Sequence, residues 1–259
     1  MKSVFPARLV LACLGSILAA SAFAQVKSDN LWRGTAGLAA AYTSGNSDTS
    51  SVALTGDFAK ASTADKIALG GSYNYARSRA NNLRTTTADK WTLQSQYDYN
   101  LTQRTYVFGK LGGEGDNLID LNWRASLAAG AGYKLIDTDQ NSLNVFGGVG
   151  YSRDRYDSLQ TINGRTGTTF SRSSLLFGEE SSHQLSDTTS FKQRLEYSPG
   201  ISGDKAQLVR FTAGLSVNMT RALALTVGLV DTYNSKPGVG KKENDVSVLT
   251  GISYRLGAP

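Results

Sequence analysis

The sequence predicts an all-β protein, a single transmembrane antiparallel up-and-down β-barrel of about twelve strands. Three observations predict this fold. The first residues have the layout of a secretory signal peptide, and from residue 33 onward apolar and polar residues alternate with period two. After Ala24 no stretch approaches the ~18 consecutive apolar residues that indicate a membrane helix.

The segment 1–24 contains the three parts of a signal peptide. These are a basic start at Lys2 and Arg8, an apolar run from Leu9 to Ala20, and an Ala22-Phe23-Ala24 cleavage site. We expect the mature chain to begin at Gln25, with a short periplasmic segment at 25–32 and the barrel over 33–259. An alternative interpretation takes Cys13 as a lipoprotein cleavage site, but the apolar segment before it is too short.

Removal of the signal also removes Cys13, the single cysteine of the chain. The mature protein therefore has no disulfide and no thiolate nucleophile or metal ligand. The net charge falls from +6 to +4 because Lys2 and Arg8 leave with the signal. No run of five like charges occurs, so we expect no nucleic-acid partner. We expect no metal and no cofactor either, because one histidine and no Asp-x-Asp-x-Asp-Gly loop are present.

The alternation is clearest from Leu121 to Leu135, where Trp123 and Leu127 share one face and Arg124 the other. Short turns and longer loops tend to alternate, as in barrels with periplasmic turns and longer outside loops. The expected strands are 33–43, 48–61, 66–79, 87–100, 105–116, 121–136, 142–157, 171–186, 191–200, 208–219, 223–234 and 245–256.

The polar face favours a barrel over the alternative, a soluble periplasmic β-sandwich. It carries many small residues with charges of both signs among them, which suits a crowded lumen better than an open solvated surface. Tyrosine and tryptophan near many strand ends indicate aromatic girdles. The charged residues expected to line the lumen are Asp57, Asp98, Lys110, Glu114, Arg124, Lys134, Arg194, Glu196 and Arg210. If they pair they brace a narrow interior, and if they separate onto opposite walls they select small charged solutes.

The expected strand 171–186 departs from the alternation. Leu175, Leu176 and Phe177 run together, and Glu179 and Glu180 follow as adjacent carboxylates. Adjacent strand residues point to opposite faces, so one carboxylate faces lipid in either register. We expect a β-bulge to redirect one of the two.

Several segments resemble a family of salt-induced outer-membrane proteins (YdiY-like), also classed as a domain of unknown function. They are the hairpin 37–54 with its Gly45-Asn46-Ser47 turn, the pair Gly130-Ala131-Gly132-Tyr133 and Gly148-Val149-Gly150-Tyr151, and the stretch 177–191. The resemblance covers nearly the whole mature chain. It implies an outer-membrane location and a barrel fold, and it assigns no catalytic or binding residue. The ending 251–256 is similar to the C-terminal signal that the barrel-assembly machinery recognises, although it ends on Leu256 and three residues follow.

Enzymatic chemistry has one candidate base, His183, which follows Ser181 and Ser182. A barrel enzyme acting on lipid is therefore an alternative, but no orienting partner is visible and we expect no catalysis. The basic loop 236–242 could contact lipopolysaccharide, although a solvated hairpin loop is the simpler interpretation. We expect a monomer in contact with outer-membrane lipid and lipopolysaccharide. Its expected role is a narrow passive pore for small solutes or stabilisation of the envelope under stress.

Overall fold

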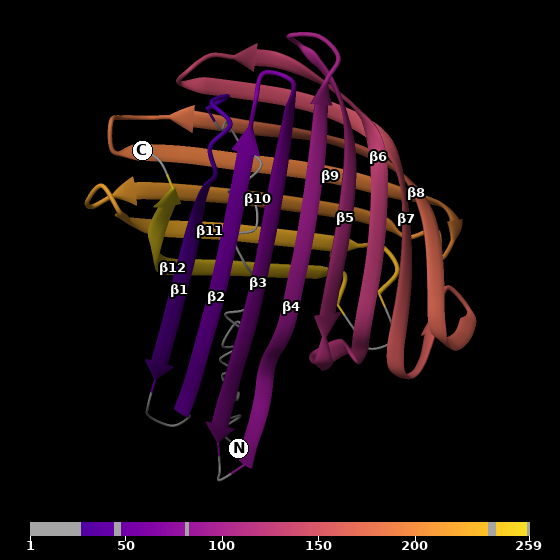
Figure 1. Cartoon of the computed structure of the whole chain (residues 1–259). Helices are drawn as coiled ribbons and strands as arrows, with labels where there is room; N and C mark the ends of the chain where they lie inside the picture. The colour runs from indigo at the N-terminus through magenta and orange to yellow at the C-terminus, as the bar shows by residue number, and fades with distance from the viewer. Residues whose placement is uncertain (1–26, 44–47, 81–82, 238–241, 258–259) are drawn as a thin grey trace, which may run out of the picture.

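The computed structural model describes residues 27–43, 48–80, 83–237 and 242–257. They form twelve antiparallel strands in a closed barrel, with one short 3-10 helix between β5 and β6 (Figure 1). The elements are β1 (Arg33–Thr43), β2 (Asp48–Ala61), β3 (Asp65–Ala80), β4 (Leu83–Asn100), β5 (Thr105–Asp116), η1 (Asn117–Ile119), β6 (Leu121–Asp137), β7 (Asn141–Ile162), β8 (Arg165–Gln184), β9 (Thr189–Gly203), β10 (Gln207–Asn218), β11 (Leu223–Asn234) and β12 (Asn244–Gly257). The predicted fold class and strand number are confirmed.

The barrel closes because the first and last strands pair. β1 and β12 are antiparallel neighbours from Arg33 opposite Gly257 to Leu38 opposite Ile252. All other neighbours follow one another in sequence, which is the up-and-down order. The strands β1–β5 in front cross β8–β12 behind at a steep angle in Figure 1, as tilted strands on opposite walls of a barrel do. A closed sheet has no free edge, so the β-sandwich alternative is wrong.

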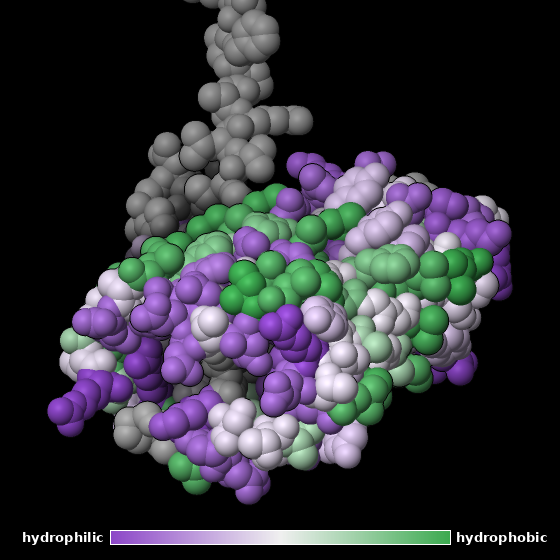
Figure 2. Space-filling view, turned by 90° about the horizontal axis from the view of Figure 1, so that it is seen from above, coloured by the Kyte–Doolittle hydropathy of each residue, from purple (hydrophilic) through white to green (hydrophobic). Residues whose placement is uncertain are grey.

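The two faces of the wall differ in polarity because side chains alternate along each strand. Leu93 and Leu111 are each 62% exposed on the outer face. On the same strands Asp98 and Phe108 point inward and are buried. Seen from above, hydrophobic residues gather in bands along the wall, while hydrophilic residues cover much of the face toward the viewer (Figure 2). An apolar exterior around a polar interior is the arrangement of a barrel that spans a lipid bilayer.

Among the residues that the structure describes, no helix is both long enough and apolar enough to cross a membrane.

The two ends of the barrel differ in their connections. Short turns join β2 to β3, β4 to β5, β6 to β7, β8 to β9 and β10 to β11, and this is called the turn end. The opposite end, called the loop end, carries the hairpin β7–β8 and the connections to β6, β10 and β12. The predicted alternation of short turns with longer loops is wrong for most connections, because the strands continue into the expected loops. At the loop end two residues join β7 to β8 and three join β9 to β10, while the connection from β11 to β12 is the long one there.

The longest hairpin shows where the predicted bounds were wrong. The segment 158–170 was expected to be a loop, yet β7 continues to Ile162 and β8 begins at Arg165. Asn163 and Gly164 join them with φ angles of 51° and 74°. Two left-handed residues make the tight turn whose twist matches the flanking strands, so the hairpin extends beyond the predicted limit. The strand expected at 87–100 likewise begins at Leu83.

The expected bulge at Glu179 and Glu180 is also wrong. The β8–β9 ladder runs without a shift from Phe177 to Gln184. Glu180 points inward and pairs with Arg194, while Glu179 points outward and accepts a hydrogen bond of 3.3 Å from the side chain of Gln193. A neighbouring polar partner therefore accommodates the outward carboxylate without any change of register.

A shift that was not expected occurs at the start of β6. The β6–β7 register changes between Leu121 and Trp123. Leu121, which the alternation placed on the outer face, is instead 1% exposed and packs with Tyr156, Ile162 and Phe170.

The segment before β1 is fixed to the turn end. Arg33 donates hydrogen bonds of 2.6 and 2.5 Å to the carboxylate of Asp29. These bonds lower the pKa of Asp29 to about 2, because the guanidinium of Arg33 stabilises the charged carboxylate. The predicted signal peptide at 1–24 lies outside the described residues, and the division at 25–32 stays a prediction.

Candidate functional site in the barrel lumen

An apolar layer occupies one side of the lumen toward the turn end. Tyr106 and Phe108 from β5 pack with Phe146 from β7 and Leu176 from β8, all buried. The Phe108 and Phe146 rings meet edge to face with centroids 5.8 Å apart. These side chains fit because inward glycines on adjacent strands leave space beneath the rings. This layer narrows the lumen on the side of β5–β8.

An ion pair crosses the lumen beside this layer. Lys110 Nζ on β5 lies 2.8 Å from Glu196 Oε1 on β9. These two strands are not neighbours in the barrel, so the contact spans the interior rather than running along the wall. Arg194 also binds Glu196 at 2.6 Å, pairs with Glu180, and lies over the Phe146 ring at 4.7 Å. The lumen is therefore braced at this level by a four-residue network against an aromatic ring.

A second network lies toward the loop end. Arg124 on β6 donates two hydrogen bonds to Asp154 on β7, of 2.7 and 2.5 Å, and one of 2.6 Å to Glu114 on β5. The two-point contact with Asp154 fixes the guanidinium plane. Because both carboxylates share one cation, this network ties three strands of one wall together and does not cross the lumen.

A cavity of about 420 Å³ lies between the cross-lumen pair and the loop end. Its wall comes from β4–β12 and carries charges of both signs. The charged residues that line it are Lys90, Lys110, Glu114, Asp116, Arg124, Arg172, Arg194, Glu196, Arg210, Lys242, Glu243 and Asp245. A space of this size suits a small polar solute.

The turn end of the lumen is polar beside the apolar layer. Asp98 is buried, accepts a hydrogen bond of 2.7 Å from Gln96 and lies 3.2 Å from Lys66 Nζ. Asp57 is 4% exposed, and its Oδ1 has no hydrogen-bond partner among the described residues. Lys134 faces Asp137 at 3.7 Å. These contacts join neighbouring residues of the wall, and none of them closes the lumen.

Of the nine predicted charged residues, six line the cavity and Asp57 and Asp98 are buried, while Lys134 faces Asp137 beside the β6–β7 turn. The structure brings Lys110, Arg194 and Glu196 into one network and Glu114 and Arg124 into another. The other four, Asp57, Asp98, Lys134 and Arg210, belong to neither network.

Sequence reasoning missed further inward charges, among them Lys66, Lys90, Asp154, Arg172, Glu180 and Lys192. Their signal was available, because each is two residues from a small or polar residue on the same face of its strand. Asp154, for example, is two residues from Ser152 and Tyr156 on one face of β7.

The alternative site at His183 lacks the geometry of a nucleophile and base. His183 Nδ1 lies 2.9 Å from Asn141 Oδ1. The Ser181 hydroxyl is buried with no hydrogen-bond partner among the described residues, so it makes no bond to the imidazole. Within the same residues, no group of three or more His, Cys, Asp or Glu side chains is placed to hold a metal ion.

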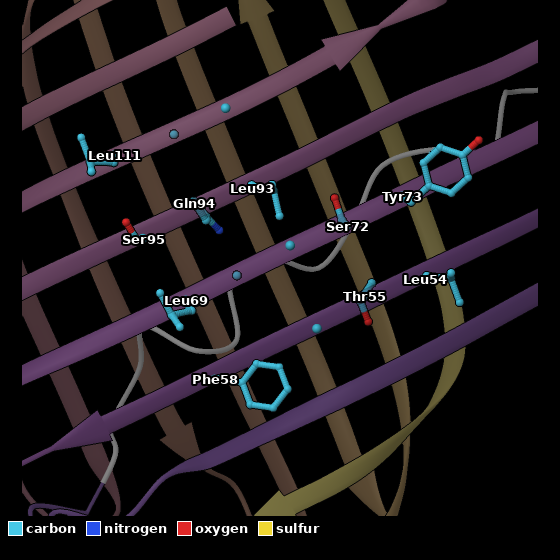
Figure 3. A pocket seen from close by; sticks show the side chains of 15 residues that line it. Leu54, Thr55, Phe58, Leu69, Ser72, Tyr73, Leu93, Gln94, Ser95 and Leu111 are labelled. Carbon is cyan, nitrogen blue, oxygen red and sulfur yellow. The ribbon is translucent and has the colours of Figure 1, made fainter. Parts of the chain in front are cut away.

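A second concavity lies on the outer wall and faces lipid. It is an apolar groove of about 750 Å³ across β2–β5, between Leu54, Leu69, Leu93 and Leu111. Figure 3 shows these leucines, with Phe58 and Tyr73, projecting from four neighbouring strands. Outward glycines at its base make the wall thin there, and nothing in the groove supplies charge for chemistry.

Comparison with known proteins gives a family and a set of similar folds. A family model described as "Protein of unknown function, DUF481" matches residues 36–256, which confirms the resemblance seen in the sequence. No curated protein matches the chain in sequence.

Similar solved structures include a porin, an outer membrane channel and the translocator domain of an autotransporter. The NanC porin is 11% identical with a TM-score of 0.45, over 87% of this chain and 97% of that chain. The COG4313 outer membrane channel from Pseudomonas putida F1 is 11% identical with a TM-score of 0.45, over 88% of this chain and 96% of that chain. The translocator domain of the autotransporter NalP from Neisseria meningitidis is 14% identical with a TM-score of 0.43, over 88% and 86% of the two chains.

Proposed function

The chain belongs to the DUF481 family of proteins of unknown function, and from its lumen we propose that it is an outer-membrane barrel acting as a narrow passive pore that an ion pair holds closed. The observation that carries this proposal is the contact between Lys110 and Glu196, which joins two non-adjacent strands across the interior.

The apolar exterior supports the location. A barrel with polar residues inside and leucines outside is stable only where lipid covers it, and bacterial barrels of this kind occupy the outer membrane. In this proposal residues 1–24 direct export, the turn end faces the periplasm, and the loop end faces outward. The partners are then membrane lipid, lipopolysaccharide and, during assembly, the barrel-assembly machinery.

The ion pair supports a gate rather than a permanent plug. The aromatic layer on β5–β8 fills part of the cross-section, and the Lys110 side chain reaches over the remainder to Glu196. Separating one such pair changes the free energy by only about 1–3 kcal/mol when both groups can be hydrated again, which makes opening accessible. Closure would then depend on a few side chains and not on movement of the wall.

Single-channel recording in planar bilayers tests the proposal. We expect brief or rare openings of the wild-type barrel and about tenfold more open time when Lys110→Met and Glu196→Gln are combined, since ~1.4 kcal/mol corresponds to a tenfold change. Both groups are replaced together because removing one leaves the other buried and uncompensated. The matched control combines Lys66→Met with Asp98→Asn, a lumen pair on adjacent strands that does not cross the interior.

The absence of current steps in the wild type, the Lys110/Glu196 variant and the Lys66/Asp98 control would contradict the pore proposal. The filled layer and the braced networks would then favour the second candidate, a barrel that stabilises the envelope. In neither case do we propose catalysis, because His183 has no activated nucleophile beside it.

A further inference from the structure

Two arginines of the lumen cavity have side-chain donors without a hydrogen-bond acceptor. Arg210 on β10 is half-buried and lines the cavity, yet it makes no hydrogen bond or ion pair with any residue of the described chain. Arg172 on β8 is 9% exposed, and its Nε has no hydrogen-bond partner there. Its nearest carboxylate oxygen, on Asp204, is 4.0 Å from Nε, which is too long for a hydrogen bond.

The acidic residues of the same cavity do not fill this gap. Glu114 is bound by Arg124, and Glu196 by Lys110 and Arg194. The side chain of Asp116 faces Lys90 at 3.7 Å.

Two further acids of the cavity, Glu243 and Asp245, are exposed, so water can satisfy them. A carboxylate in water needs no partner, whereas a guanidinium withdrawn from water costs free energy until its donors are satisfied. The guanidinium donors in the cavity therefore lack acceptors, and negatively charged acceptors would satisfy them.

The two arginines act on one region of the cavity. Both interact electrostatically with Glu114. Arg210 approaches this carboxylate from β10, and Arg172 approaches it from β8. Arg210 also acts on Lys110, which is a like charge. An anion placed there would relieve the repulsion between these cations and would accept the free guanidinium donors.

We infer that the cavity binds small anions bearing carboxylate or phosphate groups, with Arg210 and Arg172 as the donors. This inference rests on the proposed function, because it names the class of solute that the same cavity takes. The planar guanidinium matches a carboxylate or phosphate with two parallel hydrogen bonds. A cavity of about 420 Å³ admits such a solute and excludes large ones.

Isothermal titration calorimetry on the refolded, detergent-solubilised barrel tests the inference. The probes are succinate and inorganic phosphate, with choline and glucose as cationic and neutral comparators. We expect at least one anion to bind, and Arg210→Gln or Arg172→Gln to weaken it about tenfold or more, because hydrogen bonds to charged groups contribute about 1.5–3 kcal/mol. The matched control is Arg153→Gln, an exposed arginine on the outer face of β7.

The outcomes separate the anion site from the pore. Succinate without phosphate, or the reverse, assigns the group that the site prefers. Arg210→Lys, which keeps the charge but loses the two-point contact, should restore part of the affinity. Binding of neither anion, or equal binding by wild type and both glutamine variants, overturns the inference. Because titration uses the closed barrel, an absence of conductance leaves this result intact.

Discussion

Glycine positions on the inner wall determine where the aromatic layer can lie. A Cβ on Gly132 would be 2.2 Å from the Tyr106 ring, and one on Gly178 would be 2.4 Å from the Phe146 ring. Both glycines lie directly opposite those aromatics on neighbouring strands. A ring that covers a cross-strand glycine recovers packing that the missing side chain cannot supply.

The first prediction concerns this packing. Gly178→Val should lower the free energy of unfolding by about 1–3 kcal/mol, because overpacking must displace the Phe146 ring or the β9 backbone. The backbone limits the escape, since the Leu195 oxygen lies 2.5 Å from the added Cβ. Urea unfolding in lipid vesicles measures the change. The control is Gly109→Ala, where a Cβ meets nothing within 4 Å. Equal stability of Gly178→Val and wild type would contradict the packing argument.

Within a strand, the alternation decides whether a side chain faces lipid or the lumen. Leu127 on β6 is 53% exposed on the outer face, and the inward Ser126 beside it lines the cavity. This register is fixed by the hydrophobic face, because a one-residue slip would place the charges of β6 in lipid. The shift at Leu121 is compatible with this rule, because it occurs at the strand end, where the chain leaves the regular ladder.

The second prediction tests the outer face through one residue of β6. Leu127→Arg should destabilise the barrel by about 2–4 kcal/mol if the residue lies at the bilayer midplane, because lipid cannot solvate the guanidinium. Leu127→Phe keeps an apolar surface at the same position and should change stability by less than about 1 kcal/mol. The comparison uses vesicles, and equal stability of the two variants would show that β6 does not face lipid there.

For the whole molecule, closure by β1 and β12 determines both stability and environment. A closed sheet leaves no unpaired edge, but it places many leucines on the outside, where water cannot cover them favourably. Inside, the charged side chains of the two networks pair with one another.

The third prediction follows from this arrangement, in which apolar side chains lie outside and polar side chains lie inside. The chain beginning at Gln25 should refold from urea only when detergent micelles or lipid vesicles are present, and should aggregate otherwise. Far-ultraviolet circular dichroism with analytical ultracentrifugation checks the result. A monomeric, β-structured protein in plain buffer would contradict the transmembrane assignment.

The sequence by itself determined the strand number, the family and, apart from Leu121, the parity of both faces. These follow from local alternation, since a period of two assigns each side chain to one face without knowledge of its neighbours. The nine charged residues expected on the inner face could be named for the same reason, and Asp154 or Arg172 could have been added by it.

Only the tertiary structure decided which of these residues meet. Lys110 and Glu196 are 86 residues apart and on non-adjacent strands, so no local pattern relates them. No local pattern relates Arg194 to the Phe146 ring beneath it either. Whether Arg210 finds a partner depends on all the strands around it. Contacts across a lumen depend on barrel diameter and strand stagger, which arise only when the sheet closes. Alternation therefore predicted a charged interior, and closure divided it into an aromatic layer, a cross-lumen pair and a cavity.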